Sequence, residues 1–457
     1  MKILMLTIGY PPRQIGGTEV YVAGLVEALQ RRGHVSEVAY LEEVAEGRDL
    51  EVRCDNRNGT AVHAIIVPRS RYKMEFLLFD PILRERLISE FRSLATRVAP
   101  DVIHVHPLQI GLESYVMEAL RNDGHHVMLT FHSSTTTCAR GDLLQFGREV
   151  CDGRIVQTRC TECLFHRRGV PRAAAAFLSR IPLACYRVGH TSLKNGRLRR
   201  LRSFLSLPLL IEERTHAWRR ATEAAERVVA VAAWVKQVSM LNGVPERKMV
   251  LSRHGRQLQG SVRTFVPPPL PRFGFLGRLS PEKGVDVLLE AVRRTKEAKF
   301  EIEFVSATFA APRRSAEEER VVDMLKAAAA ADPRLRLRGS VPETDLGDIL
   351  ATWDALVVPS LWLESGPQVI YEALSMKTPV IGSRRGGIAE LIRHGENGFL
   401  FTPGDAQELA GLLERFAADP SPLRTMRSGI PPVRTTDDVA AEMLDEYETM
   451  VTPEAAR

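Results

Sequence analysis

Two glutamates near the carboxyl end of the chain have the spacing of a ligand-binding pair. Glu364 is predicted to lie in a loop before a helix opened by Gly366 and Pro367, with Glu372 about two turns inside that helix. A carboxylate before the helix can accept hydrogen bonds from sugar hydroxyls, one inside it can clamp a ribose diol, and free backbone N–H groups between them suit phosphate. The alternative is an acid that complements the helix dipole, followed by an exposed helix glutamate.

Two cations follow an earlier predicted strand. The segment Gly277–Gly284 carries Arg278 and Lys283 between that strand and a helical run. Gly277 lets a ligand approach the backbone closely, and two cations at a helix N-terminus form a ready phosphate site. A solvated turn is the alternative, because Arg and Lys are common between strands and helices.

Glycines and histidines mark strand ends in the first half of the chain. Gly16 and Gly17 follow the first predicted strand, where a ligand-facing loop is favoured over a merely flexible one. His132 ends a later strand, at a position where functional side chains gather, although an isolated histidine is more often structural. His104 and His106 flank the preceding strand end, and packing is the favoured interpretation for both.

The chain has six cysteines, too few for a secreted disulfide scaffold. Four of them fall in one Gly- and Arg-rich stretch, at Cys138, Cys151, Cys160 and Cys163. Thiolates at such spacing can enclose a tetrahedral zinc ion, and free thiols are the alternative. Cys54 and Cys185 are predicted to be ordinary buried residues.

Short apolar runs alternate with helical periodicity twice along the chain, which predicts two doubly wound α/β domains with parallel sheets. The predicted strands are Lys2–Thr7, Ser36–Leu41, Val62–Val67, Val102–His106, Val127–His132, Arg227–Ala232, Met249–Ser252, Arg272–Leu276, Glu301–Ser306, Arg334–Arg338, Ala355–Pro359, Pro379–Gly382 and Gly398–Phe401. A Pro-rich linker, Phe265–Pro271, separates the halves. Domains are therefore predicted over 1–262 and 263–434, with a C-terminal helix, 435–457, returning to the first domain.

Positive charge is concentrated in one segment. The chain has 62 Lys and Arg against 56 Asp and Glu, but Leu164–Ile211 holds ten basic residues and no acidic one. Within it, Lys194–Leu207 is predicted to form a basic amphipathic helix suited to an anionic membrane, with a solvated basic face as the alternative. No recognition motif for nucleic acid accompanies the charge.

Composition excludes several classes. With 44% hydrophobic and 26% charged residues, the chain is not disordered, and its length is too great for a single core. No window approaches the roughly 18 apolar residues of a spanning helix, and no signal core is apparent, so a cytoplasmic protein is expected. Neither half carries Gly-x-Gly-x-x-Gly after its first strand, and Gly255–Ser261 lacks a P-loop lysine.

Taken together, these motifs resemble the retaining glycosyltransferases of GT-B fold, glycosyltransferase family four. The family's two glutamates have seven residues between them, as Glu364 and Glu372 do. Further matching stretches follow in order, namely Ala373–Gly382, Gly386–Ile392 and Gly395–Leu400, with Gly277–Gly284 upstream and Tyr10–Pro12 and Gly16–Glu19 at the amino end. The four-cysteine insertion is similar to one in a subset of relatives, for which a structural zinc ion is implied.

The resemblance implies two Rossmann-like domains facing each other across a cleft, and metal-independent transfer from a UDP- or GDP-type sugar. By similarity, Glu372 would bind the ribose, Arg278 and Lys283 the diphosphate, and Glu364 the transferred sugar. The distal phosphate would lie against Gly366, Pro367, Gln368 and Val369, with Gly17 on the donor from the other domain. His132 would hydrogen-bond the donor sugar or the acceptor.

The acceptor implied is a glycan or lipid-linked glycan of cell-surface polysaccharide or glycoconjugate synthesis, met at the cytoplasmic face of a membrane. Three alternatives stay open. The first is an epimerase or phosphorylase of the same fold, and the second is a sugar-nucleotide-binding partner subunit without activity. A dinucleotide-dependent oxidoreductase, disfavoured by its missing motif, is the third.

Overall fold

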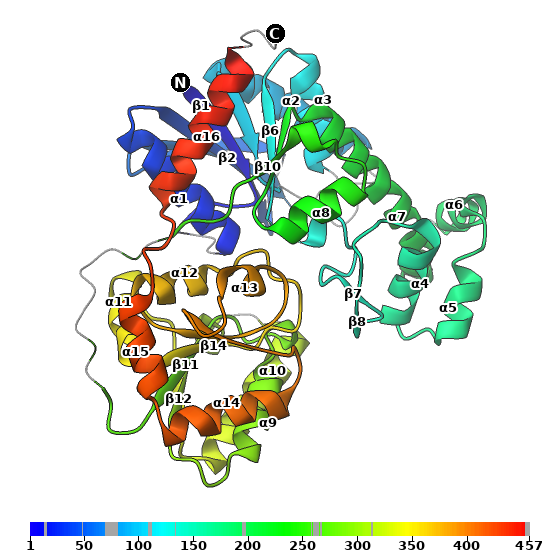
Figure 1. Cartoon of the computed structure of the whole chain (residues 1–457). Coiled ribbons are helices and arrows are strands. Elements are labelled where there is room, and N and C mark those ends of the chain that lie inside the picture. The colour runs from blue at the N-terminus through cyan, green and yellow to red at the C-terminus, as the bar shows by residue number, and fades with distance from the viewer. Residues whose placement is uncertain are drawn as a thin grey trace. The chain divides into compact units, whose positions relative to one another are not determined.

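The computed structural model describes residues 1–12, 16–47, 49–68, 81–107, 112–132, 134–193, 198–256, 258, 265, 267–311 and 314–452. They form two compact units, shown in Figure 1: unit 1 comprises Met1–Arg253 and Val439–Arg457, and unit 2 comprises His254–Asp438. The units divide at 253/254 and 438/439, where the sequence predicts divisions at 262/263 and 434/435. Residues 194–197 of the predicted basic helix and residue 266 of the predicted linker lie outside the described residues.

Unit 1 contains an eight-stranded sheet in the order β10-β9-β6-β5-β1-β2-β4-β3. Its strands are β1 (Lys2–Thr7), β2 (Val35–Val44), β3 (Glu51–Arg57), β4 (Thr60–Pro68), β5 (Val102–Val105), β6 (Val127–Phe131), β9 (Arg227–Ala230) and β10 (Met249–Leu251). All pair in parallel except β3, which runs antiparallel to β4 at the edge. The order reverses at β1, so the carboxyl ends of β1 and β5 flank a topological switch point.

Helices cover both faces of this sheet. They are α1 (Gly17–Arg31), α2 (Pro81–Val98), α3 (Leu112–Asn122), α7 (Arg199–Ala224), α8 (Ala233–Leu241) and α16 (Thr436–Val451). Alternate strand residues face opposite sides, so Leu4 and Leu6 pack toward α2, α3, α7 and α8. Ile3 and Met5 pack toward α1 and α16. The last helix of the chain thus completes the core of the unit that contains the first strand (Figure 1).

An insertion extends from unit 1 between β6 and β9. It consists of the short hairpin β7 (Leu144–Gln145) and β8 (Glu149–Val150), the helices α4 (Gln157–Arg167), α5 (Arg172–Leu178) and α6 (Leu183–Ser192), and the first part of α7. Its own core is small and contains Leu164, Phe165, Ala175, Tyr186, Leu207, Leu209 and Ile211. In Figure 1 the helices α4, α5 and α6 lie beside the amino-terminal part of α7, away from the sheet.

Unit 2 contains a six-stranded parallel sheet in the order β13-β12-β11-β14-β15-β16. Its strands are β11 (Arg272–Leu276), β12 (Glu301–Val305), β13 (Leu335–Arg338), β14 (Ala355–Val358), β15 (Val380–Ser383) and β16 (Gly398–Phe401). The helices are α9 (Val285–Arg294), α10 (Ala316–Ala331), α11 (Glu343–Thr352), α12 (Gln368–Ser375), α13 (Gly386–Leu391), α14 (Ala406–Ala418) and α15 (Ser421–Gly429). The order reverses between β11 and β14, which places a second switch point there.

The predicted fold class is confirmed, since both units are Rossmann-like α/β domains and each predicted strand has a counterpart. Three features differ from the prediction. The exposed edge strand β3 and the hairpin β7–β8 were not anticipated. The basic helix predicted over Lys194–Leu207 is wrong in its extent, because the helix begins at Arg199 and continues to Ala224. Pro208 lies inside it, although proline usually ends a helix.

Candidate functional site

Two loops meet at the switch point of unit 2. One follows β11 and contains Arg278 and Lys283, and the other follows β14 and contains Glu364. The Leu361 backbone N–H donates to the Glu282 carbonyl at 2.9 Å, which ties the loops together. Gly284 has a φ of +70°, and a Cβ there would lie 2.0 Å from a backbone oxygen of the second loop. Only glycine permits this approach, so the loops are positioned by backbone contact.

Lys283 and Glu364 form a buried ion pair between these loops. Lys283 Nζ lies 2.6 Å from Glu364 Oε1, and the Ser360 hydroxyl donates to the same oxygen at 2.8 Å. Burial alone would raise the pKa of Glu364, but the charge of Lys283 and the hydrogen bonds to the carboxylate hold it below the usual value. Glu364 is therefore ionised at neutral pH, with an acceptor-only carboxylate at the strand end.

Glu372 lies in α12 and pairs with a cation that the sequence motifs did not indicate. Arg256 Nε donates to Glu372 Oε1 at 2.5 Å, and its Nη2 lies 2.9 Å from Glu343 Oε1. Burial raises the pKa of Glu372 in spite of this guanidinium. Arg256 stands in the loop after β10, so a Gly-Arg pair at a strand end was the available signal, and it is a weak one.

The turn before α12 is packed closely against its surroundings. Gly366 has a φ of +134°, and its carbonyl oxygen lies 3.0 Å from Nδ1 of the buried His254. The Gly387 N–H donates to the Glu364 carbonyl at 2.7 Å, and a Cβ on Gly387 would lie 2.7 Å from the Gly366 nitrogen. The glycine pair Gly386-Gly387 thus holds the turn in which Glu364 and Gly366 stand.

Polar groups without protein partners surround the first turn of α12. Gln368 is the first residue of this helix, and its buried Nε2 has no hydrogen-bond partner among the described residues. The same holds for the buried hydroxyl of Ser280 in the loop after β11. Arg278 in that loop is exposed and makes no ion pair with another described residue. Together with the open N–H groups of the first turn, these donors could accommodate a polyanion.

In unit 1, His132 belongs to a group of aromatic side chains at the ends of β5 and β6. His132 Nε2 and His106 Nδ1 share a hydrogen bond of 2.8 Å, and Tyr21 of α1 packs edge-on with its ring centroid 4.8 Å from that of His132. His104 lies deeper: its Nε2 and Thr130 Oγ1 share a hydrogen bond of 2.6 Å, as do its Nδ1 and Tyr447 Oη. Complete burial lowers the pKa of His104 to about 3, so it is a neutral core residue.

Gly17 is the first residue of α1, next to the end of β1. A Cβ built on Gly17 would meet no atom of the described residues within 4 Å. Packing against the described residues therefore does not require a glycine at position 17, in contrast to Gly284 and Gly387.

The four clustered cysteines line one cavity in the insertion, whereas Cys54 and Cys185 are exposed. The prediction that these last two are buried is wrong, because Cys54 stands on the edge strand β3 and Cys185 on α6, at the surface of the insertion. No group of three or more His, Cys, Asp or Glu side chains in the described residues stands ready to hold a metal ion.

Two protein-family models match separate parts of the chain. Residues 16–180 match the family model of the glycosyl transferase 4-like domain, and residues 264–431 match that of glycosyl transferases group 1. The two matched stretches lie in separate units of the structure, the first in unit 1 and the second in unit 2. The group 1 match contains the Lys283–Glu364 pair and Glu372.

Two curated relatives illustrate the range of the similarity. The amylovoran biosynthesis glycosyltransferase AmsK of Erwinia amylovora is 26% identical over 46% of this chain and 51% of its own length. The chain therefore spans about half the length of this relative. An uncharacterized glycosyltransferase of Methanocaldococcus jannaschii is 24% identical over 92% of this chain and 90% of its own length.

Solved structures share the fold over almost the whole chain. Sucrose-phosphate synthase from Thermosynechococcus elongatus gives a TM-score of 0.65 at 18% identity, covering 98% of this chain and 99% of that one. HepE of Anabaena, solved in complex with UDP-glucose, gives 0.59 at 16% identity, covering 98% of this chain and 100% of that one. At these identities the likeness establishes the GT-B fold.

Proposed function

We propose that the protein is a retaining hexosyltransferase that moves a sugar from a nucleoside diphosphate sugar to a glycan or lipid-linked acceptor in cell-surface glycoconjugate synthesis. The observation that carries the proposal is the arrangement around α12. Two buried glutamates, each paired with a cation, flank a helix N-terminus at the switch point of the domain that matches group 1 glycosyltransferases. The complex of HepE with UDP-glucose supports a nucleotide-sugar ligand. Donors of both the UDP and the GDP type are included in the proposal.

The roles follow from the chemistry of each group. Glu372 accepts hydrogen bonds from the ribose hydroxyls, and Glu364 accepts them from the sugar that is transferred. Arg278, Lys283 and the N–H groups of the first turn of α12 hold the diphosphate. Charge grows on the phosphate oxygens as the glycosidic bond breaks, so cations and dipoles already in position lower the barrier.

The transfer is proposed to proceed on one face of the sugar without a metal ion. The bond from C1 to the diphosphate oxygen breaks, the acceptor oxygen bonds to C1 on the same face, and the acceptor proton passes to the departing diphosphate. This differs from retaining hydrolases, which form a covalent glycosyl enzyme on a carboxylate. Activity should persist when Mg²⁺ and Mn²⁺ are omitted, and NMR of the first product should show the anomeric configuration of the donor.

Donor identity is best tested by thermal shift with a panel of nucleotide sugars, because a ligand that binds the folded state raises Tm. The donor that stabilises the wild type most should lose its effect in Glu372→Gln and in Arg278→Ala, while both variants keep the unliganded Tm within a few degrees. Stabilisation by every nucleotide sugar alike, or full turnover in both variants, would contradict the proposed site.

Gly17 offers a test of unit 1 that separates binding from folding. Alanine is accommodated there by the described residues, and a compatible Gly→Ala change stabilises by about 0.4–1 kcal/mol because it lowers the conformational entropy of the unfolded chain. Gly17→Ala should therefore fold with an equal or higher Tm. If the position faces the donor, turnover should nevertheless fall at least tenfold, and unchanged kcat/KM would remove Gly17 from the site.

The insertion supports a membrane-proximal acceptor. Five of its large apolar side chains in the described residues are exposed, namely Phe177, Val188, Val150, Leu198 and Leu201, with exposed fractions of 72%, 65%, 53%, 49% and 46%. Exposed arginines stand among them at Arg172, Arg180, Arg187 and Arg200. Apolar side chains among cations suit the surface of an anionic bilayer, which would place the enzyme on the cytoplasmic face. No helix in the described residues combines the length and apolar character of a bilayer span.

Liposome flotation tests this contact. The protein should float with vesicles containing phosphatidylglycerol and not with phosphatidylcholine alone, and Phe177→Ser with Leu201→Ser should reduce recovery. Ile82→Ser is the matched control, because Ile82 of α2 is 73% exposed outside the insertion. Equal recovery with both vesicle types would exclude the anionic surface as the partner.

A further inference from the structure

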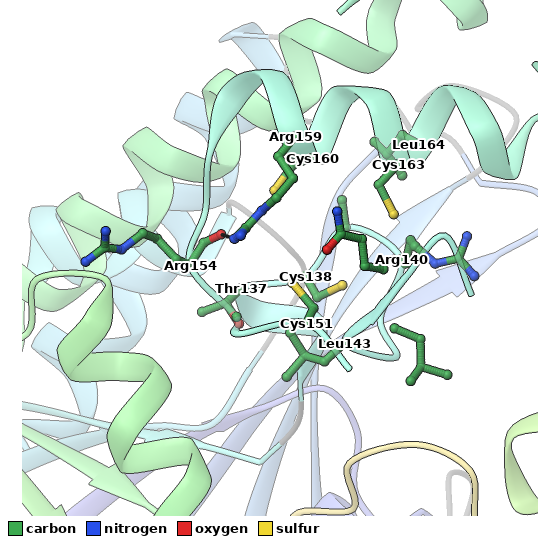
Figure 2. Close-up of a pocket in the computed structure, with 14 residues that line it drawn as sticks. Thr137, Cys138, Arg140, Leu143, Cys151, Arg154, Arg159, Cys160, Cys163 and Leu164 are labelled. Atoms are coloured by element: carbon green, nitrogen blue, oxygen red, sulfur yellow. Dashed lines mark hydrogen bonds between the residues drawn. The ribbon is translucent and has the colours of Figure 1, made fainter. Parts of the chain in front are cut away.

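Four cysteines from separate parts of the insertion meet at one small cavity. Cys138 follows the end of β6, Cys151 follows the hairpin β7–β8, and Cys160 and Cys163 stand three residues apart on one face of α4. In Figure 2, α4 lies above the loop that carries Cys138 and Cys151, and its two cysteines extend toward that loop. All four cysteine side chains line this cavity.

All four side chains are free thiols, and backbone contacts already support one of them. The Phe146 N–H donates to Cys163 Sγ at 3.3 Å. Leu143 and Phe146 adopt positive φ values of 52° and 54°, as do the adjacent glycines Gly141 and Gly147. Since non-glycine residues rarely adopt this conformation, the loop is wound tightly around the cavity at some conformational cost.

The segment is tied to the rest of unit 1 on both sides of Cys151. Arg214 of α7, a buried residue, donates to the carbonyl oxygens of Thr135 and Cys138, the second at 3.0 Å. Asn242 accepts from the Ile155 N–H at 2.8 Å and donates to the Gly153 carbonyl at 2.9 Å. These bonds fix both ends of the loop that carries Cys138 and Cys151 against the rest of unit 1.

Cationic side chains adjoin the cavity. Arg140 and Arg159 line it, each paired with an aspartate of the same loop: Arg140 Nη2 lies 3.0 Å from Asp142, and Arg159 Nη2 lies 2.5 Å from Asp152. A divalent ion with four thiolates carries a net charge of −2, since four negative charges outweigh two positive ones. Both arginines line the same cavity as the four sulfurs, where their N–H groups can support metal ligands as outer groups do, although each charge is shared with its aspartate.

The insertion needs a stabilising element beyond its apolar core. Its core consists of the seven buried residues named above, and the stretch from 138 to 156 contains only two two-residue strands. Small structural elements that cannot bury much apolar surface are commonly completed by a metal ion or by disulfides. Four sulfur ligands in tetrahedral arrangement favour zinc or an iron–sulfur cluster.

We propose that Cys138, Cys151, Cys160 and Cys163 bind one structural Zn²⁺ ion that fastens the cysteine loop to α4. Because no three ligands in the described residues stand at ion-binding spacing, binding must draw the sulfurs inward by small movements of the loop. Zinc is proposed because four cysteines that include a Cys-x2-Cys pair are a common ligand set of structural zinc sites. The proposed ion has a structural role in the insertion. It takes no part in the proposed glycosyl transfer, which uses no metal.

Metal analysis of the full chain tests the proposal directly. Protein purified from medium with added zinc should carry one equivalent of zinc, which Cys160→Ser and Cys138→Ser should lose. Cys185→Ser and Cys54→Ser are matched controls, since both cysteines are exposed and outside the cavity, and both should keep the full equivalent. Equal zinc content in all four variants would overturn the proposal.

Cobalt replacement provides a readout that does not depend on a variant's folding. Wild-type protein loaded with Co²⁺ should show the thiolate charge-transfer and intense d–d absorption of a tetrahedral sulfur site, and a chelator should lower its Tm. Absence of the bands and of any equivalent of metal would overturn the proposal. So would a Cys–Cys disulfide found by mass spectrometry of unreduced protein, or iron accompanied by inorganic sulfide.

Discussion

Paired charges dominate unit 2 at the scale of single residues. Lys283 with Glu364 and Arg256 with Glu372 each place an ionised group in a largely buried position. Such pairs contribute little net stability, but removing one partner leaves the other charge buried and unpaired. Glu364 and Glu372 also differ from each other, because the surroundings lower the pKa of the first and raise that of the second.

Lys283→Met should therefore destabilise the protein by about 3 kcal/mol at pH 7, because Glu364 remains buried without its cation. The wild-type pair adds stability above the unfolded carboxyl pKa of 4.5, and this gain is lost as pH falls through the lower folded value. In the variant, burial raises the folded pKa, so the penalty disappears as the carboxyl group is protonated. Denaturant unfolding at pH 7 and pH 4 measures the difference.

Glu364→Gln added to Lys283→Met is the control, and it should recover part of the loss at pH 7. An equal destabilisation at both pH values would show that the lost packing of the lysine stem accounts for the effect. An unpaired buried carboxylate would then not be its cause.

At the scale of elements, the site depends on loops that glycines allow to approach one another. The pairing of β11 with β14 brings Arg278, Lys283 and Glu364 to neighbouring strand ends, whereas the sequence placed each residue only after a strand. How closely the loops then pack depends on Gly284, Gly386 and Gly387, whose backbones lie against neighbouring backbones. The position of the turn before α12 is thus set by contacts with Gly386 and Gly387 as well as by its own sequence.

Gly387→Ala should displace this turn, because the added methyl would lie 2.7 Å from the Gly366 nitrogen. Nucleotide-sugar binding is expected to weaken at least tenfold, with a Tm loss of a few degrees. Gly411→Ala in α14 is the matched control, since nothing stands within 4 Å of its Cβ, and it should bind normally with an equal or higher Tm. Isothermal titration with the identified donor measures both, and unchanged affinity in Gly387→Ala would contradict the expectation.

The C-terminal helix is held to the sheet of unit 1 by a buried polar bond as well as by apolar packing. Tyr447→Phe should cost about 1–3 kcal/mol, because it leaves the fully buried His104 Nδ1 without its partner. Tyr115→Phe is the comparison, since its bond to Glu213 at 2.9 Å is only partly buried and should cost less. Equal losses in urea unfolding would show that burial does not set the difference.

Sequence patterns predicted the strands well because parallel strands buried on both faces are continuous apolar runs, as in Ile3–Leu6. The edge strand β3 was missed since its residues, such as Arg53 and Asp55, are exposed and polar. The predicted helix end at Leu207 is wrong because the packing of Leu209 and Ile211 in the insertion core favours continuation through Pro208. Two contacts could not be predicted, namely that of Arg256 with Glu372 and that of His106 with His132. Both depend on which loops and strands are neighbours, and the sequence pattern alone does not specify this.

At the scale of the molecule, each unit contains a buried neutral histidine. Burial lowers the pKa of His104 in unit 1 to about 3 and that of His254 in unit 2 to about 4, against 6.5 when unfolded. A depressed folded pKa gives stability that is present above the unfolded value and lost as pH falls below it. Both units should therefore weaken together in mild acid.

Below pH 6.5, unfolding free energy should fall by about 1.4 kcal/mol per pH unit for each histidine, before the carboxyl groups begin to titrate. Calorimetry between pH 7 and pH 5 measures the slope. His104→Gln should remove the pH dependence of stability that unit 1 contributes and leave the contribution of unit 2 unchanged. A free energy of unfolding that does not change across this pH range would show that neither histidine stays neutral in the folded protein.

The return of α16 to unit 1 has a consequence for the order of folding on the ribosome. Unit 2 is one continuous stretch, so it can close as soon as it has been synthesised. Unit 1 contains the first strand, yet the face of its sheet that bears Ile3 and Met5 waits for Met443 and Tyr447. The domain that is begun first is finished last, and a nascent chain ending at Asp438 should expose that apolar face to chaperones.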